Sequence, residues 1–149
     1  MKTNDSERAA YYRLALYLGL ESGEAAVAWA DELVSATASP SDALIELAMT
    51  KPGDVTSLRH ALLPLAGERP SDAVVGEVLG IIAEHWHGGR RSFADTITVL
   101  KQLRDTRLLA PAIAEDLLRF ELRAYGATPE KKAALEAELA AWLAARSRL

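Results

Sequence analysis

The chain has 149 residues, no cysteine and a formal net charge of −4. The missing cysteine excludes disulfides and thiolate metal sites, and the negative charge argues against a general nucleic-acid binder. The length favours one domain, so we expect residues 1–149 to form a single helical domain. The N-terminus is polar, and no apolar run approaches the roughly 18 residues of a membrane span. We therefore expect a soluble, cytoplasmic protein without a membrane partner.

Alanine and leucine dominate the sequence, which favours helix nearly everywhere. Asn4 or Asp5 is expected to cap a first helix that extends from Ser6 to Leu20. Ser22 is expected to cap a second helix that lasts to about Thr37.

Prolines mark the next two predicted helices. Pro40 is expected at the first position of the third helix, and Lys51-Pro52-Gly53 ends that helix. Asp54 is expected to cap the fourth helix, which Pro64 ends early or kinks. The sequence Pro-Ser-Asp-Ala occurs at Pro40 and again at Pro70. Because these residues are common helix starters, convergent capping explains the likeness better than a repeat does.

The densest run of branched aliphatic residues lies in the middle of the chain, between Pro70 and Arg91. Its large apolar residues recur at the spacing of one helical face: Val74, Val75, Val78, Leu79, Ile82 and Trp86. A helix with so wide an apolar face is expected to be covered on more than one side. Gly76 and Gly80 belong to a stripe of small residues, which indicates close packing within the chain or, as the weaker alternative, a homodimer contact. Gly88-Gly89 ends the helix.

The last three predicted helices have start signals at Ser92 with Asp95, at Pro111 and at Thr128. Glu115 and Arg119 are expected to pair on the surface of the seventh helix. Lys101, Arg104 and Arg107 recur every three residues, and Arg119 and Arg123 follow further on. These bases are interpreted as a solvated face with local acid partners such as Asp105 and Glu115 or, as the alternative, as a docking patch for an acidic surface.

Eight helices with short connections predict an all-α fold of consecutive antiparallel hairpins. Such an arrangement resembles a HEAT or TPR array, although the consensus positions of those families are absent. A compact orthogonal bundle is the alternative.

A search for chemistry finds no catalytic motif, so no catalytic residue and no cofactor are predicted. Glu84 and His87 form a Glu-x-x-His pair of the kind used in di-iron bundles, but no second copy exists. His85 and His87 point to different sides of a helix, so no metal site is predicted. Arg90 and Arg91 follow two glycines and precede a helix N-terminus, which is a weak anion-binding pattern or an ordinary solvated turn.

Charge is distributed unevenly along the chain. The first 50 residues carry eight acids and three bases, whereas residues 101–149 carry seven acids and nine bases. Six acids lie on or beside the predicted second and third helices, namely Glu21, Glu24, Asp31, Glu32, Asp42 and Glu46. Such acids keep a small protein soluble, and they can also bind a basic protein partner.

The sequence therefore predicts a non-enzymatic protein-interaction module, such as an adaptor or an inhibitor or immunity-type protein. Its partner is expected to be a protein with a basic surface. The alternative hypothesis is a small-molecule, anion or metal binder centred on residues 84–91. A third hypothesis is a homodimer formed through a helix face.

Overall fold

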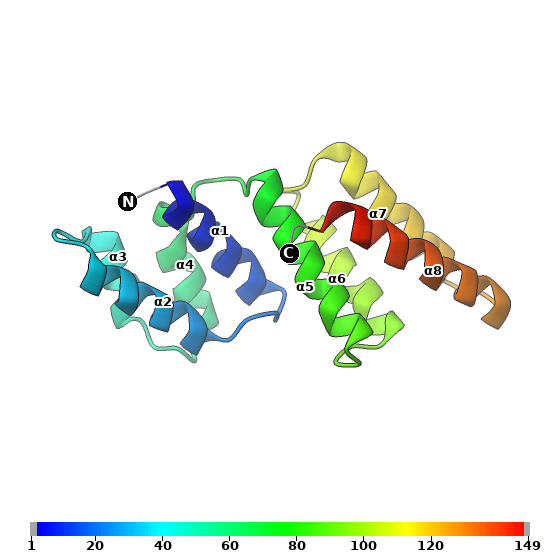
Figure 1. Cartoon of the computed structure of the whole chain (residues 1–149), viewed down its shortest axis with the longest axis horizontal. Helices are drawn as coiled ribbons and strands as arrows, with labels where there is room; N and C mark the ends of the chain where they lie inside the picture. Colours follow the sequence, from blue (N-terminus) through cyan, green and yellow to red (C-terminus); the bar gives the residue numbers. More distant parts are fainter. Residues whose placement is uncertain (1–2, 148–149) are drawn as a thin grey trace. The chain divides into compact units, whose positions relative to one another are not determined.

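A computed structural model describes residues 3–147, and the all-α prediction is confirmed over this range. These residues form eight α-helices and no strand (Figure 1). The helices are α1 (Thr3–Tyr17), α2 (Gly23–Ala36), α3 (Asp42–Met49), α4 (Val55–Ala66), α5 (Asp72–His87), α6 (Phe93–Asp105), α7 (Pro111–Ala124) and α8 (Pro129–Arg146). No helix within residues 3–147 is long and apolar enough to cross a membrane.

The packing contacts divide the chain into two compact units, residues 1–74 and residues 75–149. The first unit contains α1 to α4 and the first residues of α5, and the second contains the rest of α5 with α6 to α8. The single domain over residues 1–149 stays a prediction. Consecutive hairpins and a compact bundle are both compatible with this order of helices.

In the first unit, α4 packs against α1 and α3, and α2 packs against α3. Tyr11, Leu47, Leu58 and Leu62 are fully buried there. Leu58 and Leu62 are four residues apart, so they lie on the same face of α4. This leucine face is what joins α4 to the helices around it.

In the second unit, α7 packs against α6 and α8. Leu135, Leu139 and Leu143 are fully buried and recur every four residues along α8. That spacing places the three leucines on one face, as the sequence predicts. Glu138, Trp142 and Arg146 lie beside this leucine face and become important in the hairpin described below.

The prediction for the central helix is confirmed. Val78 and Ile82 are fully buried in α5, and Trp86 is half-buried near the end of this helix. Gly89 adopts a φ of 79°, a left-handed conformation that suits glycine and ends the helix as expected. Gly76, in the small-residue stripe, is also buried.

The predicted capping residues Ser22, Asp54, Ser92 and Thr128 each accept a hydrogen bond from the backbone N–H three residues later. Ser41 and Ser71 do the same, with N–H to Oγ distances of 3.2 Å. Both Pro-Ser-Asp-Ala copies are therefore helix caps, which agrees with convergent capping.

The predicted bounds of the first helix are wrong. α1 covers Thr3–Tyr17 rather than Ser6–Leu20. Asn4 and Asp5, which were expected to precede the helix as caps, lie inside its first turn. The C-terminal end comes early because Gly19 adopts a φ of 69°, which a continuing right-handed helix cannot include.

The prediction for Pro40 needs correction, and so does one of the two alternatives for Pro64. Pro40 lies before α3 rather than at its first position, because the hydroxyl of Ser41 accepts from the Leu44 N–H and makes Asp42, two residues after Pro40, the first residue of the helix. Pro64 does not end α4 early, since the helix continues to Ala66.

Candidate functional site

Exposed acids gather on α2 and α3, which pack against each other. Glu24, Asp31 and Glu32 are exposed on α2, whereas Ala26 and Ala30 of the same helix are fully buried. Glu24 and Asp31 are seven residues apart, so they lie two turns apart on the same side. The α2 helix thus directs small apolar side chains to the core and carboxylates to the solvent.

The α3 helix combines acids with exposed apolar side chains. Asp42 and Glu46 are exposed, and Met49 is 81% exposed. Ile45, four residues before Met49, is 37% exposed. Because residues four apart share a helix face, Ile45 and Met49 form a short apolar strip beside the two carboxylates.

Glu21, the sixth predicted acid, is bound by a side chain of α1. It is half-buried, and its Oε1 accepts a hydrogen bond of 2.8 Å from the hydroxyl of Tyr11. This contact ties the start of the α2 segment to α1. Glu21 therefore has a structural partner in addition to its predicted role in binding.

No described residue forms an ion pair with the other five acids, which are Glu24, Asp31, Glu32, Asp42 and Glu46. No base lies between Arg13 and Lys51 in the sequence. The negative charge of α2 and α3 is therefore not neutralised from within these helices. We refer to these five carboxylates as the acidic surface.

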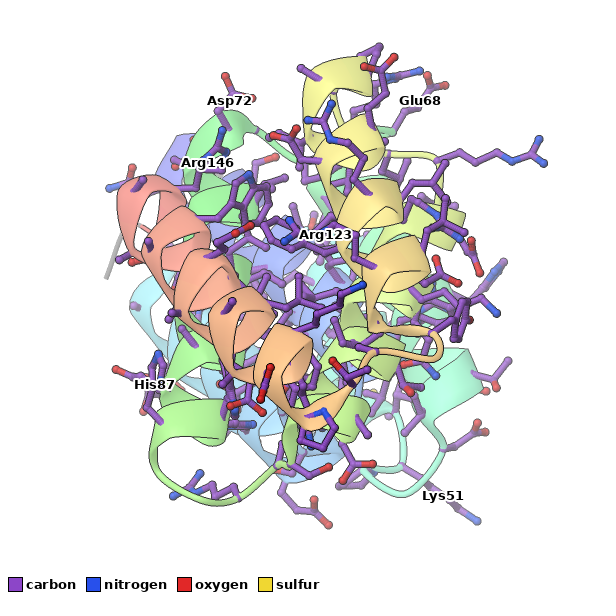
Figure 2. The ribbon with its side chains drawn as sticks, turned by 90° about the vertical axis from the view of Figure 1, so that its right-hand side faces the viewer. Lys51, Glu68, Asp72, His87, Arg123 and Arg146 are labelled. Atoms are coloured by element: carbon purple, nitrogen blue, oxygen red, sulfur yellow. The ribbon has the colours of Figure 1, made fainter. Side chains whose placement is uncertain are left out.

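The predicted metal candidates lie at the end of α5. Glu84 and His87 are exposed, and His85 is half-buried. The His87 ring projects outward (Figure 2) and stacks on Trp86, with ring centroids 4.9 Å apart. Within residues 3–147, no three histidine or acidic side chains gather as a metal site requires.

The turn after α5 contains the predicted anion-binding arginines. Arg90 is exposed and Arg91 is half-buried. Their backbone N–H groups donate to the carbonyl of His85, at 2.8 and 3.0 Å. These two amides close the helix end and are therefore not free to bind an anion.

Comparisons with models of protein families, with curated proteins and with solved structures find no match for this chain. The candidate function is therefore inferred from its own charges and contacts. A second candidate for the functional site is a network of polar contacts in the hairpin of α7 and α8.

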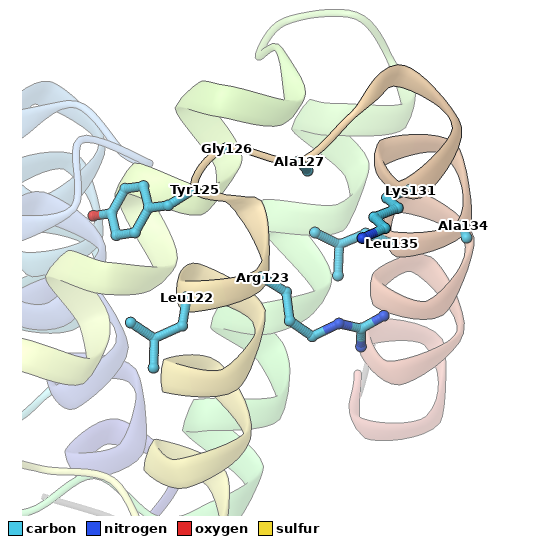
Figure 3. A pocket seen from close by; sticks show the side chains of 8 residues that line it. All are labelled: Leu122, Arg123, Tyr125, Gly126, Ala127, Lys131, Ala134 and Leu135. Atoms are coloured by element: carbon cyan, nitrogen blue, oxygen red, sulfur yellow. The ribbon is translucent and has the colours of Figure 1, made fainter.

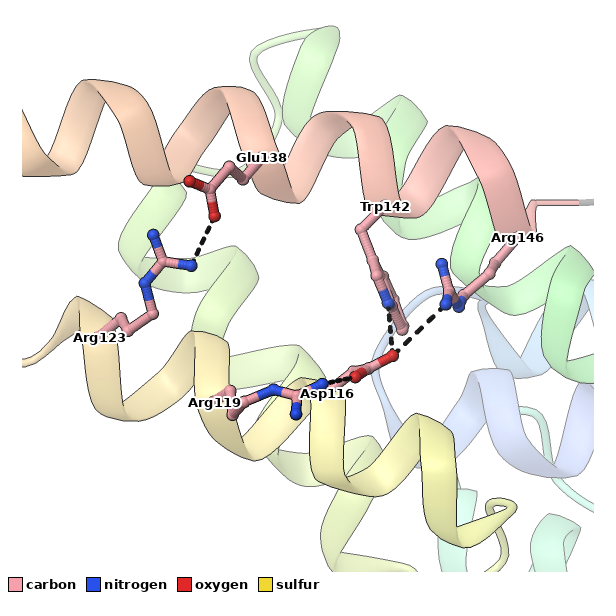
Figure 4. A network of polar contacts seen from close by, with 6 residues as sticks. All are labelled: Asp116, Arg119, Arg123, Glu138, Trp142 and Arg146. Atoms are coloured by element: carbon pink, nitrogen blue, oxygen red, sulfur yellow. Dashed lines mark hydrogen bonds and ion pairs between the residues drawn. The ribbon is translucent and has the colours of Figure 1, made fainter.

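Asp116 of α7 gathers three donors (Figure 4). Its Oδ2 accepts from the indole Nε1–H of Trp142 at 2.9 Å and from Arg146 at 3.4 Å, and its Oδ1 accepts from Arg119. Farther along, Arg123 pairs with Glu138 of α8 at 2.5 Å. Since the charges of this network satisfy one another, it serves to hold α8 on α7.

The expected surface pair of Glu115 and Arg119 is not formed. Arg119 binds Asp116 instead, three residues before it on α7. Asp116 is the better partner because its carboxylate is already fixed by Trp142 from α8. Nothing in the local spacing distinguishes the two acids, since both lie within one helical turn of Arg119.

A pocket of about 500 Å³ opens at the end of the same hairpin (Figure 3). Leu122, Tyr125 and Leu135 form apolar walls, and Arg123 and Lys131 add two cations. The lining contains no serine or histidine. This pocket could not be found from the sequence, because it depends on how two helices are spaced in the folded protein.

Asp116 is expected to stabilise the hairpin in a pH-dependent way. The hydrogen bond from Trp142 is the main cause that lowers the pKa of Asp116, with Arg119 and Arg146 acting in the same direction and burial opposing them. A lowered pKa means that this stabilisation is present above the ordinary pKa of about 4 and is lost as the pH falls through the lowered value. Asp116→Asn should therefore reduce the free energy of unfolding by about 1 kcal/mol at pH 7.

Urea unfolding followed by circular dichroism at pH 7 and pH 3 measures this effect. The difference between wild type and Asp116→Asn should be smaller at pH 3, because the Asp116 carboxylate of the unfolded chain takes up a proton below its ordinary pKa of about 4. Glu115→Gln, at the neighbouring exposed acid, is the matched control and should behave as wild type at both values. An equal loss at both pH values would mean that the carboxylate charge does not hold the hairpin.

Proposed function

We propose that this chain is a cytoplasmic, non-enzymatic protein-interaction module, of the adaptor or inhibitor and immunity type. It binds a basic protein partner through the acidic surface of α2 and α3. The observation that carries the proposal is the set of five exposed carboxylates without a described ion-pair partner, in a stretch that has no base between Arg13 and Lys51.

The contrast between the two units supports this choice. Asp116 of α7 and Glu138 of α8 are bound to arginines of the same hairpin. The arginines neutralise the negative charge of these two carboxylates within the hairpin. The carboxylates of α2 and α3 project an uncompensated field into the solvent, and such a field steers a partner of opposite charge during the approach.

The exposed side chains of α3 indicate how such a partner is held after it arrives. Met49 and Ile45 offer apolar area next to Asp42 and Glu46. Methionine is flexible and adapts to irregular apolar surfaces. A partner with a basic rim around an apolar patch would satisfy both features, with the charges setting the rate and the apolar contact the lifetime.

Charge reversal on α2 tests the proposal. The variant with Glu24→Lys, Asp31→Lys and Glu32→Lys should associate with a partner captured from native cells at least about tenfold more slowly at low salt. The salt dependence of its association rate should also flatten. Stopped-flow or surface-based kinetics over a range of salt concentrations measure both effects.

The matched control carries the same change of charge on exposed acids of the second unit. Glu84→Lys, Glu115→Lys and Glu130→Lys alter residues that form no ion pair with a described residue. This control should keep most of the wild-type rate. If both triple variants slow association equally, only net charge matters, and if neither slows it, the acidic surface is not the binding site.

A further inference from the structure

Two arginines of the first unit lie together where α1 packs against α4. The Nε–H of Arg59 donates to the backbone carbonyl of Arg13 at 3.3 Å. The guanidinium carbon of Arg59 also lies 4.6 Å from the ring centroid of Tyr17. Tyr17 follows Arg13 by one helical turn, so both project from the same face of α1. The Arg59 guanidinium and the Tyr17 ring therefore meet beside the backbone of Arg13, whose positive charge lies near enough to act on Arg59.

This arrangement is electrostatically unusual. Neither Arg13 nor Arg59 forms an ion pair with a described residue, although acids outnumber bases in residues 1–74. The Nε of Arg13 is buried and has no hydrogen-bond acceptor among the described residues. Burial and the charge of Arg13 both lower the pKa of Arg59, with burial as the larger cause. Like charges held together oppose folding unless something compensates them.

The donors that remain are arranged for an anion. Arg59 uses its Nε–H on the Arg13 carbonyl, which fixes its plane and leaves its terminal nitrogen atoms for another acceptor. The Tyr17 ring supports the same guanidinium from one side, and Tyr17 is 43% exposed. A planar guanidinium fixed in this way binds the oxygens of phosphate and carboxylate groups in a bidentate fashion.

We propose that Arg13 and Arg59 form a binding site for a small oxyanion of the phosphate or carboxylate class. The two guanidinium groups hold the anion, and its charge relieves the repulsion between them. Tyr17 provides a flat surface for the organic group that carries the anion. The site is separate from the acidic surface, because it uses α1 and α4 and the opposite sign of charge.

Inorganic phosphate is the probe for the first test. Thermal unfolding is followed as phosphate replaces chloride at constant ionic strength. Phosphate stabilises proteins in general by exclusion from their surface, so a background rise in Tm is expected for every variant. Wild type should show an additional, saturable rise, and isothermal titration calorimetry should give a Kd for it. Acetate titrated in the same way distinguishes carboxylates from phosphates as the bound class.

Arg13→Met and Arg59→Met remove one guanidinium each and keep much of the apolar stem. Either change should weaken phosphate binding by about tenfold or more, since each removes a charge-assisted contact. Arg69→Met, at an exposed arginine of the same unit, should bind as wild type does. In the absence of phosphate at low ionic strength, Arg59→Met should be as stable as wild type or more stable, because the repulsion is gone.

Two results would contradict the proposed anion site. If Arg59→Met and Arg69→Met respond to phosphate and acetate identically, the arginine pair is not an anion site. If saturable binding survives in Arg59→Met and is lost in Arg90→Met, the anion belongs to the turn after α5 and the proposal is wrong. Circular dichroism of each variant confirms that it is folded before these comparisons are made.

Discussion

Replacing Gly23 with alanine is expected to destabilise the first unit by more than about 3 kcal/mol, although it adds a single methyl group. Gly23 is the first residue of α2 and is buried. A Cβ atom at this position would lie 1.7 Å from the carbonyl oxygen of Pro52 and 2.8 Å from a methyl carbon of Leu58. Since the closest atom belongs to the backbone, the α2 helix and the loop before α4 must move apart to admit the methyl group.

Gly53→Ala is the matched control, in the same loop that Gly23 contacts. A Cβ at Gly53 meets nothing within 4 Å, so this change should leave the stability within about 0.5 kcal/mol of wild type. Urea unfolding followed by circular dichroism compares the two variants. A Gly23→Ala protein as stable as Gly53→Ala would show that α2 does not approach Pro52 as closely as described.

The second large effect is expected at a buried ion pair of the second unit. Arg104 of α6 binds Glu121 of α7, whose side chain is only 8% exposed. The other carboxylate oxygen of Glu121 accepts a 2.9 Å hydrogen bond from the hydroxyl of Tyr125. Arg104→Met should lower the free energy of unfolding by about 3 kcal/mol, because it leaves a buried carboxylate without its counter-charge.

A double-mutant cycle separates the ion pair from the loss of packing. Glu121→Gln added to Arg104→Met removes the uncompensated charge and keeps an acceptor for Tyr125, so the double variant should recover much of the lost stability. If the two changes instead add, Glu121 is hydrated in the folded protein and does not depend on Arg104. Chemical denaturation at pH 7 gives the free energy of unfolding of wild type, of the two single variants and of the double variant.

Features that depend on neighbouring residues could be predicted from the sequence. Ser22 and Ser92 were identified as caps because a serine before an apolar run is a local signal, and both accept the expected N–H. The buried face of α5 followed from the spacing of Val78 and Ile82. The exposure of Glu24 was also predictable, since a carboxylate on an amphipathic helix stays outside the core.

Features that join distant parts of the chain could not be predicted in this way. Arg104 was interpreted as part of a solvated face with Asp105, and it does contact Asp105 at 3.3 Å. Its contact with Glu121, seventeen residues later, depends on how α6 and α7 pack. The close approach of Gly23 to Pro52 is likewise set by tertiary packing, for which helical periodicity carries no signal.

The composition of α2 and α3 also determines which covalent chemistry can reach the proposed binding surface. These helices contain carboxylates and no lysine. Amine-directed crosslinkers and lysine acylation therefore leave the whole surface untouched. Carbodiimide activation acts on carboxylates, and the exposed Lys51 that follows α3 is an amine of the same chain close in sequence to Glu46. A zero-length amide between Glu24 and a lysine of a second protein would thus be a direct record of contact with a partner.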